Sequence, residues 1–111
     1  MSINSKGRRR IIVGGKTYLW YVALDDDSPY NILHVISDDK YVILSCPLNT
    51  GTGYVISKGR SFQSKETDGR WNRYLLPFDI PDSITPGFVE RLIVWATQDT
   101  DAVPASGIFP V

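Results

Sequence analysis

The chain has 111 residues, of which 42% are hydrophobic and 22% are charged, and its 12 Lys and Arg balance its 12 Asp and Glu. This length suits one domain with a single core, and this composition excludes an intrinsically disordered chain. The formal net charge of zero excludes an overall attraction to nucleic acid or to an anionic membrane, so any such binding has to be local.

Cysteine content and hydropathy predict a cytoplasmic protein. Cys46 is the only cysteine, which excludes an intrachain disulfide and is typical of a reducing compartment. Glycine and lysine at positions 14–16 interrupt the apolar run that follows the basic N-terminus, so we expect no signal peptide. No stretch approaches the roughly 20 apolar residues of a spanning helix, so we expect no membrane partner. We predict a single domain over residues 1–111, with residues 1–8 flexible.

The beginning of the chain predicts a β-hairpin. Arg9–Val13 and Lys16–Leu24 are β-rich runs on either side of Gly14-Gly15. Two glycines suit a two-residue turn because they adopt positive φ without a Cβ clash. The cluster at residues 25–29, three aspartates followed by Ser-Pro, predicts a turn after this hairpin.

Residues 30–37 and 40–46 flank Asp38-Asp39 and predict a second hairpin with a two-residue turn. In that register Val35 lies opposite Val42, and both faces of the hairpin are apolar. Two apolar faces are typical of central strands that are covered on both sides. The first hairpin is more mixed in polarity, so we expect it nearer an edge of the sheet.

The second half of the chain predicts short strands and one helix. Residues 54–57, 60–63 and 70–76 read as strands, residues 64–69 as a polar turn and residues 99–107 as a polar tail.

The helix is expected from Pro86 to about Gln98, with Thr85 as its cap and Ile84 and Val89 at the spacing of a hydrophobic staple. Its apolar residues recur at three- and four-residue intervals: Phe88, Val89, Leu92, Ile93, Trp95 and Ala96.

These elements predict an α+β fold, in which an antiparallel sheet of five or six strands has one C-terminal helix packed on one face. One helix covers only one face of a sheet, so the second apolar face needs another cover. Either residues 70–86 wrap over it or it meets another chain. We favour the wrapping segment and leave a homodimer open.

Catalytic and metal-binding signals are weak. One His and one Cys exclude a Cys/His zinc site within one chain, and we expect no metal and no cofactor. Cys46 and His34 form the only conventional nucleophilic pair, but they do not sit opposite one another in the predicted hairpin. Carboxylates could in principle converge for acid–base catalysis, and nothing in the sequence singles them out: Asp79, Asp82 and Glu90. We therefore expect a protein that is not an enzyme, with a small enzyme of unknown class as the third hypothesis.

Acidic residues gather in the predicted turns and are the candidate partner-binding residues. Such acidic groups could dock into a cationic cleft of another protein, and the alternative is that they are ordinary solvated turns. The candidates are Asp25, Asp26, Asp27, Asp38 and Asp39.

Basic residues interleaved with aromatic residues predict an alternative function, binding of single-stranded nucleic acid. Cations would follow the phosphates while aromatic rings stack on the bases. The alternative is that these aromatic residues belong to the core and that residues 6–10 are a frayed tail. The candidates are Arg60, Arg70, Trp71, Arg73 and Tyr74.

Two stretches carry a loose resemblance: residues 9–20 (RRIIVGGKTYLW) and residues 84–96 (ITPGFVERLIVWA), together less than a quarter of the chain. They resemble small bacterial single-domain proteins with a basic N-terminal hairpin and a C-terminal Thr-Pro helix, a group that implies no particular activity. In size and single-domain architecture the chain is also similar to immunity proteins that neutralise secreted bacterial toxins. This similarity implies a protein partner, for example a toxin domain. The leading hypothesis is therefore a non-enzymatic protein-binding module of the immunity type.

Overall fold

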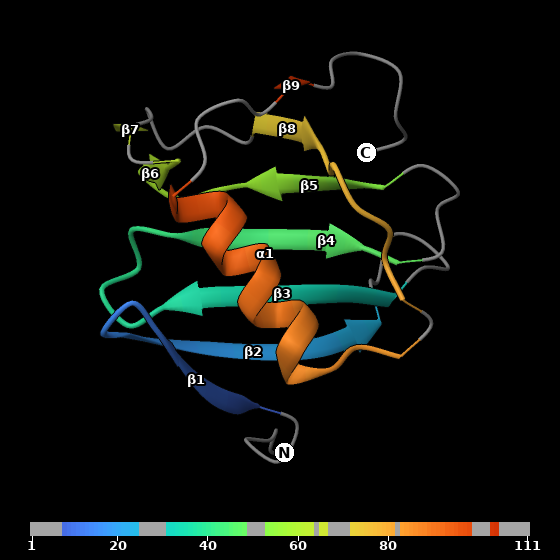
Figure 1. Ribbon diagram of the computed structural model, residues 1–111, viewed down its shortest axis with the longest axis horizontal. Helices are drawn as coiled ribbons and strands as arrows, with labels where there is room; N and C mark the ends of the chain where they lie inside the picture. Colours follow the sequence, from blue (N-terminus) through green and yellow to red (C-terminus); the bar gives the residue numbers. More distant parts are fainter. Residues whose placement is uncertain are drawn as a thin grey trace.

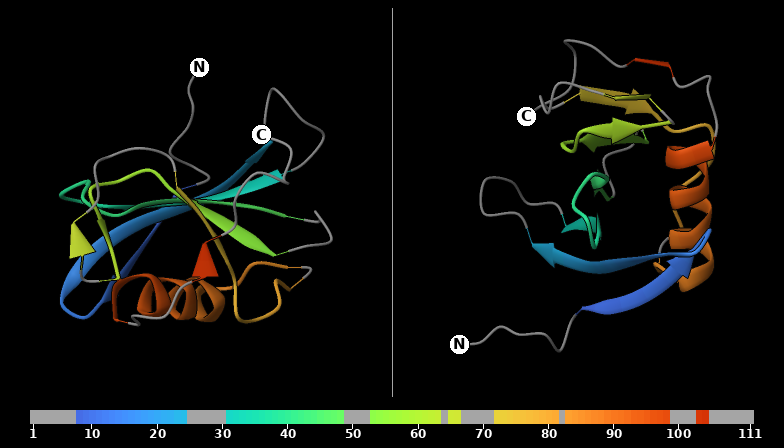
Figure 2. Two further views of the ribbon diagram at one scale, coloured as in Figure 1. Left: turned by 90° about the horizontal axis from the view of Figure 1, so that it is seen from above. Right: turned by 90° about the vertical axis from the view of Figure 1, so that its left-hand side faces the viewer.

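An antiparallel sheet curves around one helix in this protein (Figures 1 and 2). The computed structural model describes residues 8–24, 31–48, 53–63, 65–66, 72–81, 83–98 and 103–104. In this part of the chain the helix lies diagonally across one face of the sheet (Figure 1), and the other face carries no helix (Figure 2). The α+β fold predicted from the sequence, a sheet with one C-terminal helix on one face, is confirmed.

Strands that follow one another in the sequence are mostly neighbours in the sheet, whose order is β1-β2-β3-β4-β5-β8-β9. The strands are β1 (Arg9–Val13), β2 (Lys16–Leu24), β3 (Asn31–Ser37), β4 (Ile43–Pro47), β5 (Tyr54–Ser57), β8 (Asn72–Leu75) and β9 (Val103–Pro104). A separate hairpin of β6 (Ser61–Phe62) and β7 (Lys65–Glu66) interrupts the sequence between β5 and β8. The helix α1 spans Pro86–Gln98.

The first hairpin forms as predicted. Val13 pairs with Lys16, and both residues of the turn have positive φ, 59° at Gly14 and 82° at Gly15. The strand β1 is the last strand on its side of the sheet, which confirms the expected position of this hairpin at an edge.

The second hairpin is real, but its predicted register is wrong. Val35 lies opposite Leu44 instead of Val42, so the loop is longer than two residues. The Ser37 N–H donates to the Val42 carbonyl (2.9 Å), while the Val42 N–H donates to the Ser37 hydroxyl (3.0 Å). Lys40, with a φ of 62°, makes the turn. Because the register differs by two residues, every side chain stays on its predicted face.

The predicted covering of the second face by residues 70–86 is also wrong for the described part of that segment. The ring of Phe78 packs edge-on against Phe88 (5.8 Å between centroids) and Trp95 (6.2 Å), both on the helix. Leu76 and Ile80 pack against the same core cluster. The segment after β8 therefore adds to the helix side and leaves the opposite face to be considered separately.

Two very short strands form where the sequence predicts a turn and a tail. The strand β7 falls inside the expected turn at residues 64–69, and β9 falls inside the expected tail at residues 99–107. Val103 lies opposite Leu75, and Pro104 lies opposite Tyr74. Strands of two residues have no readable alternation, so tertiary pairing alone creates them.

Side chains cap the helix at both ends. The Thr85 hydroxyl accepts the N–H of Phe88 (3.2 Å), as the sequence predicts. At the other end Gln63 donates its backbone N–H to the Ala96 carbonyl (2.6 Å) and its Nε2 to the Trp95 carbonyl (3.1 Å). These carbonyls belong to the last turn, where no partner exists within the helix. The six helix residues expected in the core are all buried.

Gly59 allows the β5–β6 connection to pack closely against the beginning of β4. A Cβ at this position would overlap the Tyr41 carbonyl oxygen and would lie 2.9 Å from the Ile43 backbone nitrogen. The neighbouring backbone is hydrogen-bonded there, because Lys58 N–H donates to the Ile43 carbonyl (2.8 Å) and Ser61 N–H to the Tyr41 carbonyl (2.9 Å). Neither side can move without breaking these bonds.

We therefore expect Gly59→Ala to lower the free energy of unfolding by ~1–3 kcal/mol, the usual effect of forcing a group into a packed site. Gly87→Ala is the matched control, because nothing lies closer than 3.8 Å to a Cβ there and alanine favours the helix. Urea unfolding followed by circular dichroism measures both variants. Equal stabilities of the two variants would contradict this account.

Candidate functional site

The two faces of the sheet differ in how far they are buried. Side chains on the helix side form the core, and several of them are fully buried: Leu33, Val35, Leu44, Cys46 and Val55. On the opposite side Ser45 (1% exposed), Tyr54 (4%) and Ile56 (9%) are buried over β4 and β5. Burial on that side does not continue to β1.

Over β1, β2 and β3 the side opposite the helix is apolar and partly exposed. Ile12 is 70% exposed, and the other members are half-buried. Alternation along the strands and the observed registers place them all on the same side. We call this surface the open face; it consists of Ile12, Leu19, Tyr21, Ile32, His34 and Ile36.

A row of polar contacts crosses the open face. Tyr21 and His34 are cross-strand partners with stacked rings, 5.0 Å between centroids. His34 Nδ1 lies 3.1 Å from the Ser45 hydroxyl on β4, and the Arg8 guanidinium lies 4.9 Å from the centre of the Tyr21 ring. The arginine and the tyrosine are thus held in position on this face, and both are residue types enriched at protein interfaces.

The Cys46–His34 pair considered from the sequence does not form. Cys46 lies opposite Leu33 and its side chain is on the helix side, whereas His34 lies opposite Ser45 on the other side of the sheet. Burial raises the pKa of the Cys46 thiol to about 12, so the nucleophilic thiolate is scarce near neutral pH.

We expect the Cys46 thiol to resist a thiol-modifying reagent in the native protein at mildly alkaline pH, because it is fully buried and its pKa is raised. Modification should reach completion once denaturant unfolds the chain. Absorbance of the released chromophore follows both reactions. Fast stoichiometric labelling under native conditions would show that Cys46 is accessible.

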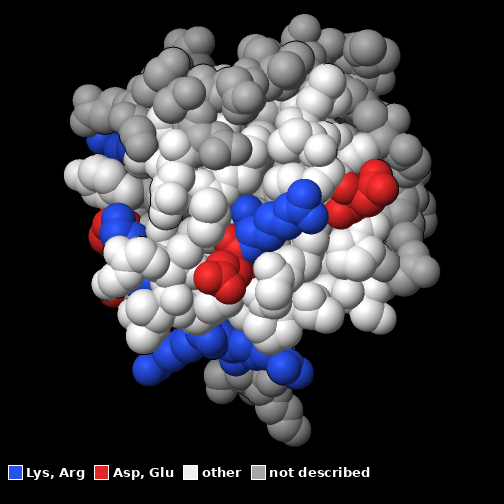
Figure 3. Space-filling model, viewed as in Figure 1, with Lys and Arg blue, Asp and Glu red and all other residues white. Residues whose placement is uncertain are grey.

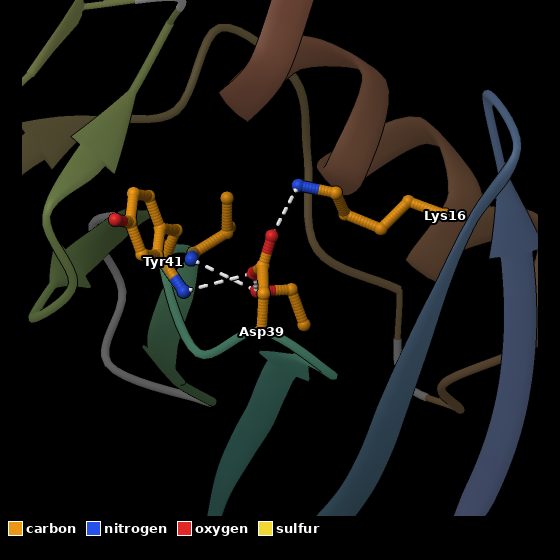
Figure 4. Close-up of polar contacts among 5 residues, drawn as sticks. Lys16, Asp39 and Tyr41 are labelled. Carbon is orange, nitrogen blue, oxygen red and sulfur yellow. Dashed lines mark hydrogen bonds and ion pairs between the residues drawn. The ribbon is translucent and has the colours of Figure 1, made fainter.

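Among the acidic candidates, Asp39 binds other residues of the chain. The Asp39 carboxylate accepts hydrogen bonds from the Lys16 ammonium (2.7 Å), the Ser37 hydroxyl (2.6 Å) and the Tyr41 N–H (3.0 Å) (Figure 4). The bond from Lys16, followed by those from Ser37 and Tyr41, holds the pKa of Asp39 well below its usual range. Asp39 thereby joins the β1–β2 turn to the β3–β4 loop.

Of the four other acidic candidates, the structure describes only Asp38. Asp38 is exposed beside Asp39, and its backbone N–H donates to the Thr17 carbonyl (3.0 Å). Asp25, Asp26 and Asp27 lie outside the described residues.

We expect Asp39→Asn to lower the thermal unfolding midpoint at neutral pH, with Asp38→Asn as the control of equal charge change. A carboxylate whose pKa is depressed by folding stabilises the native state above the unfolded pKa, about 4 for aspartate, and loses this effect as the pH falls. The difference between wild type and Asp39→Asn should therefore shrink below about pH 4. A difference that stays constant down to strongly acidic pH would contradict this role.

The basic and aromatic candidates for nucleic-acid binding are separated by the fold. Tyr74 stacks on Phe62 in the core (4.2 Å between centroids), whereas Arg73 follows the opposite side of the sheet. The Nε of Arg73 is buried with no hydrogen-bond partner among the described residues. Arg60 is exposed at the turn before β6. Arg70 and Trp71 lie outside the described residues.

A shallow groove of about 490 Å³ lies between the helix and the segment after β8. The Arg91 guanidinium lies 4.3 Å from the centre of the Phe78 ring, and Glu90 is also part of the lining. Of the carboxylates considered for acid–base catalysis, Glu90 and Asp79 are exposed and Asp82 lies outside the described residues. The groove is on the helix side and is therefore separate from the open face.

Sequence reasoning missed a basic edge. Arg8, Arg9 and Arg10 are all exposed, and cationic side chains gather over β1 at one edge of the molecule (Figure 3). Arg9 lies over the Trp20 ring (5.6 Å), much as Arg8 lies over Tyr21. Arg9 and Arg10 lie in the strand that the sequence predicts, and a frayed tail over residues 6–10 was only an alternative. The three arginines were not named as candidate site residues, although the mixed polarity of the first hairpin next to a basic run was a usable signal.

Comparisons of the chain with protein-family models, with curated proteins and with solved structures gave no match. Among the residues that the structure describes, no helix is long and apolar enough to cross a membrane.

Proposed function

We propose that this chain is a non-enzymatic protein-binding module that contacts its partner through the open face. The observation that carries the proposal is the exposure of apolar side chains over β1, β2 and β3, opposite the helix, with Ile12 70% exposed. Contiguous apolar surface rimmed by polar groups marks interaction sites in soluble proteins. Within this role we favour an immunity protein, which neutralises a secreted bacterial toxin.

The chemistry of the open face favours a protein partner. It combines branched aliphatic side chains with a tyrosine that is stacked between Arg8 and His34. At the described strand positions on this side of the sheet, arginine is the only charged residue type, at Arg10 and Arg73. An apolar centre with tyrosine and arginine is the usual composition of a protein–protein interface.

The structure supports nucleic-acid binding less well. Base stacking requires exposed aromatic faces next to the cations. Phe62, Trp20 and Tyr18 are 4%, 6% and 3% exposed, and the ring of Tyr74 stacks on Phe62. Tyr74, the one aromatic candidate within the described residues, packs against the core that contains these three buried rings, which favours the protein-binding proposal.

Immobilised wild-type chain should retain a protein from a lysate of its native host. Ile36→Lys should lower the affinity for that protein at least ~10-fold, which corresponds to about 1.4 kcal/mol of binding free energy. Ile36 is half-buried on the open face, and the long lysine stem can lie along the sheet with its ammonium in water. Gln98→Lys is the matched control, because it adds the same charge at an exposed position on the helix. Affinities are measured by surface plasmon resonance with the isolated partner.

Equal binding by wild type, Ile36→Lys and Gln98→Lys would reject the open face as the interface. Retention of nucleic acid in place of protein would reject the proposal and favour the alternative function. The immunity role has its own test, since the partner expressed alone should stop bacterial growth and co-expression of this chain should restore it. A harmless partner would leave a binding module that is not an immunity protein.

A further inference from the structure

At alternate residues, β1 directs its backbone N–H and C=O groups away from β2. Within β1 and β2, paired residues alternate between those that exchange backbone hydrogen bonds and those that turn these groups outward. The Thr17 carbonyl accepts the Asp38 N–H (3.0 Å), so the backbone of Thr17 points toward β3. Ile12, the partner of Thr17, therefore directs its own N–H and C=O to the outer edge, and Arg10, two residues earlier, does the same.

This outer edge is unpaired in the described part of the chain. The strand β1 pairs with β2 alone, and no backbone hydrogen bond joins its outer edge to any other described residue. An exposed edge strand is a template for an added strand, and proteins commonly protect such edges with charge. Here the edge carries arginines at one end and the 70% exposed Ile12 at the other.

The charges at this edge specify what can be added to it. Arg8, Arg9 and Arg10 are consecutive and exposed, and the rings of Tyr21 and Trp20 hold the first two arginines in place. Guanidinium groups form strong, often bidentate hydrogen bonds with carboxylates. A strand that lies next to β1 would place alternate side chains beside Arg10 and Ile12, at the border of the open face.

We propose that β1 is the docking edge for an extended, acidic segment of the partner protein, which is added to the sheet as a further strand. Its backbone pairs with the N–H and C=O groups of Arg10 and Ile12, its carboxylates bind the three arginines, and an apolar side chain covers Ile12. The inference rests on the proposed protein-binding function and specifies how the partner is held. A second copy of this chain is a poor occupant, because its β1 (Arg9–Val13) carries no carboxylate that could bind the arginines.

The test uses an acetylated and amidated octapeptide of four valines followed by four glutamates as the probe, with the matching peptide of four valines and four lysines as its control. In an antiparallel strand this order places valine beside Ile12 and glutamates beside the three arginines. The acidic peptide should bind with an affinity that falls as salt is added, and the lysine peptide should not bind. Amide hydrogen exchange measured by NMR should slow at Arg10 and Ile12, whose N–H groups face outward in the free protein.

Two variants of the chain separate the backbone contribution from the charge contribution. Ile12→Pro removes an outward N–H without removing a bond to β2, and edge strands accept proline at such positions. This variant should bind the acidic peptide at least ~10-fold more weakly than wild type does. Ile12→Val, which keeps the N–H, should bind it within about twofold of wild type. Arg10→Glu keeps the backbone N–H and reverses the charge. It should bind the acidic peptide more weakly than wild type does, and it should bind the lysine peptide.

Equal binding of the two peptides, unchanged binding by Ile12→Pro and Arg10→Glu, or slowed exchange at sites other than β1 would overturn the inference. A dimer of the chain alone in sedimentation velocity, lost in Arg10→Glu or Ile12→Pro, would name a second copy as the occupant and would also overturn it. If the acidic peptide fails to bind but Ile36→Lys still disrupts the natural complex, the edge inference fails and the proposed function stands. If the peptide binds as expected but Ile36→Lys has no effect on that complex, the open face is rejected and the edge stands.

Discussion

The burial of one apolar helix stripe against one face of the sheet is the constraint on which the rest of this structure depends. Val89, Leu92, Ile93 and Ala96 are fully buried there, and the sheet curves around the helix (Figure 2). The segment after β8 packs on the same side through Phe78. Because helix and segment share one side, the other side over β1 to β3 keeps apolar side chains partly exposed, and the proposed function follows from this imbalance.

Polar contacts hold this arrangement from the edges inward. Thr85 and Gln63 satisfy the two ends of the helix, and Asp39 joins the first hairpin to the second through Lys16. The Lys16–Asp39 contact joins the turn before β2 to the β3–β4 loop, and β2 in turn pairs with the edge strand β1. Among the described residues β1 is a basic strand whose outer edge is unpaired, and such an edge suits the extended acidic segment proposed above.

The fold was largely predictable from local patterns, and the features that were predicted wrongly have a common cause. The helix bounds, the Thr85 cap and the first turn follow from periodicity, side-chain chemistry and the glycine pair. The predicted register of β3 and β4 was wrong because the loop between them is longer than the aspartate pair indicated. The Ser37 hydroxyl closes this longer loop by accepting the Val42 N–H. The pairs β6–β7 and β8–β9 were missed because two-residue strands have no pattern of their own.

The candidate site was less predictable. The sequence by itself determined that the sheet has two apolar faces and one helix to cover them, because alternation and helical periodicity are local properties of the chain. Only the tertiary structure decided that residues 76–81 join the helix side, that Asp39 is used within the chain and that Tyr74 faces the core while Arg73 does not. These outcomes depend on contacts between residues far apart in the sequence, and such contacts are set by packing rather than by local pattern.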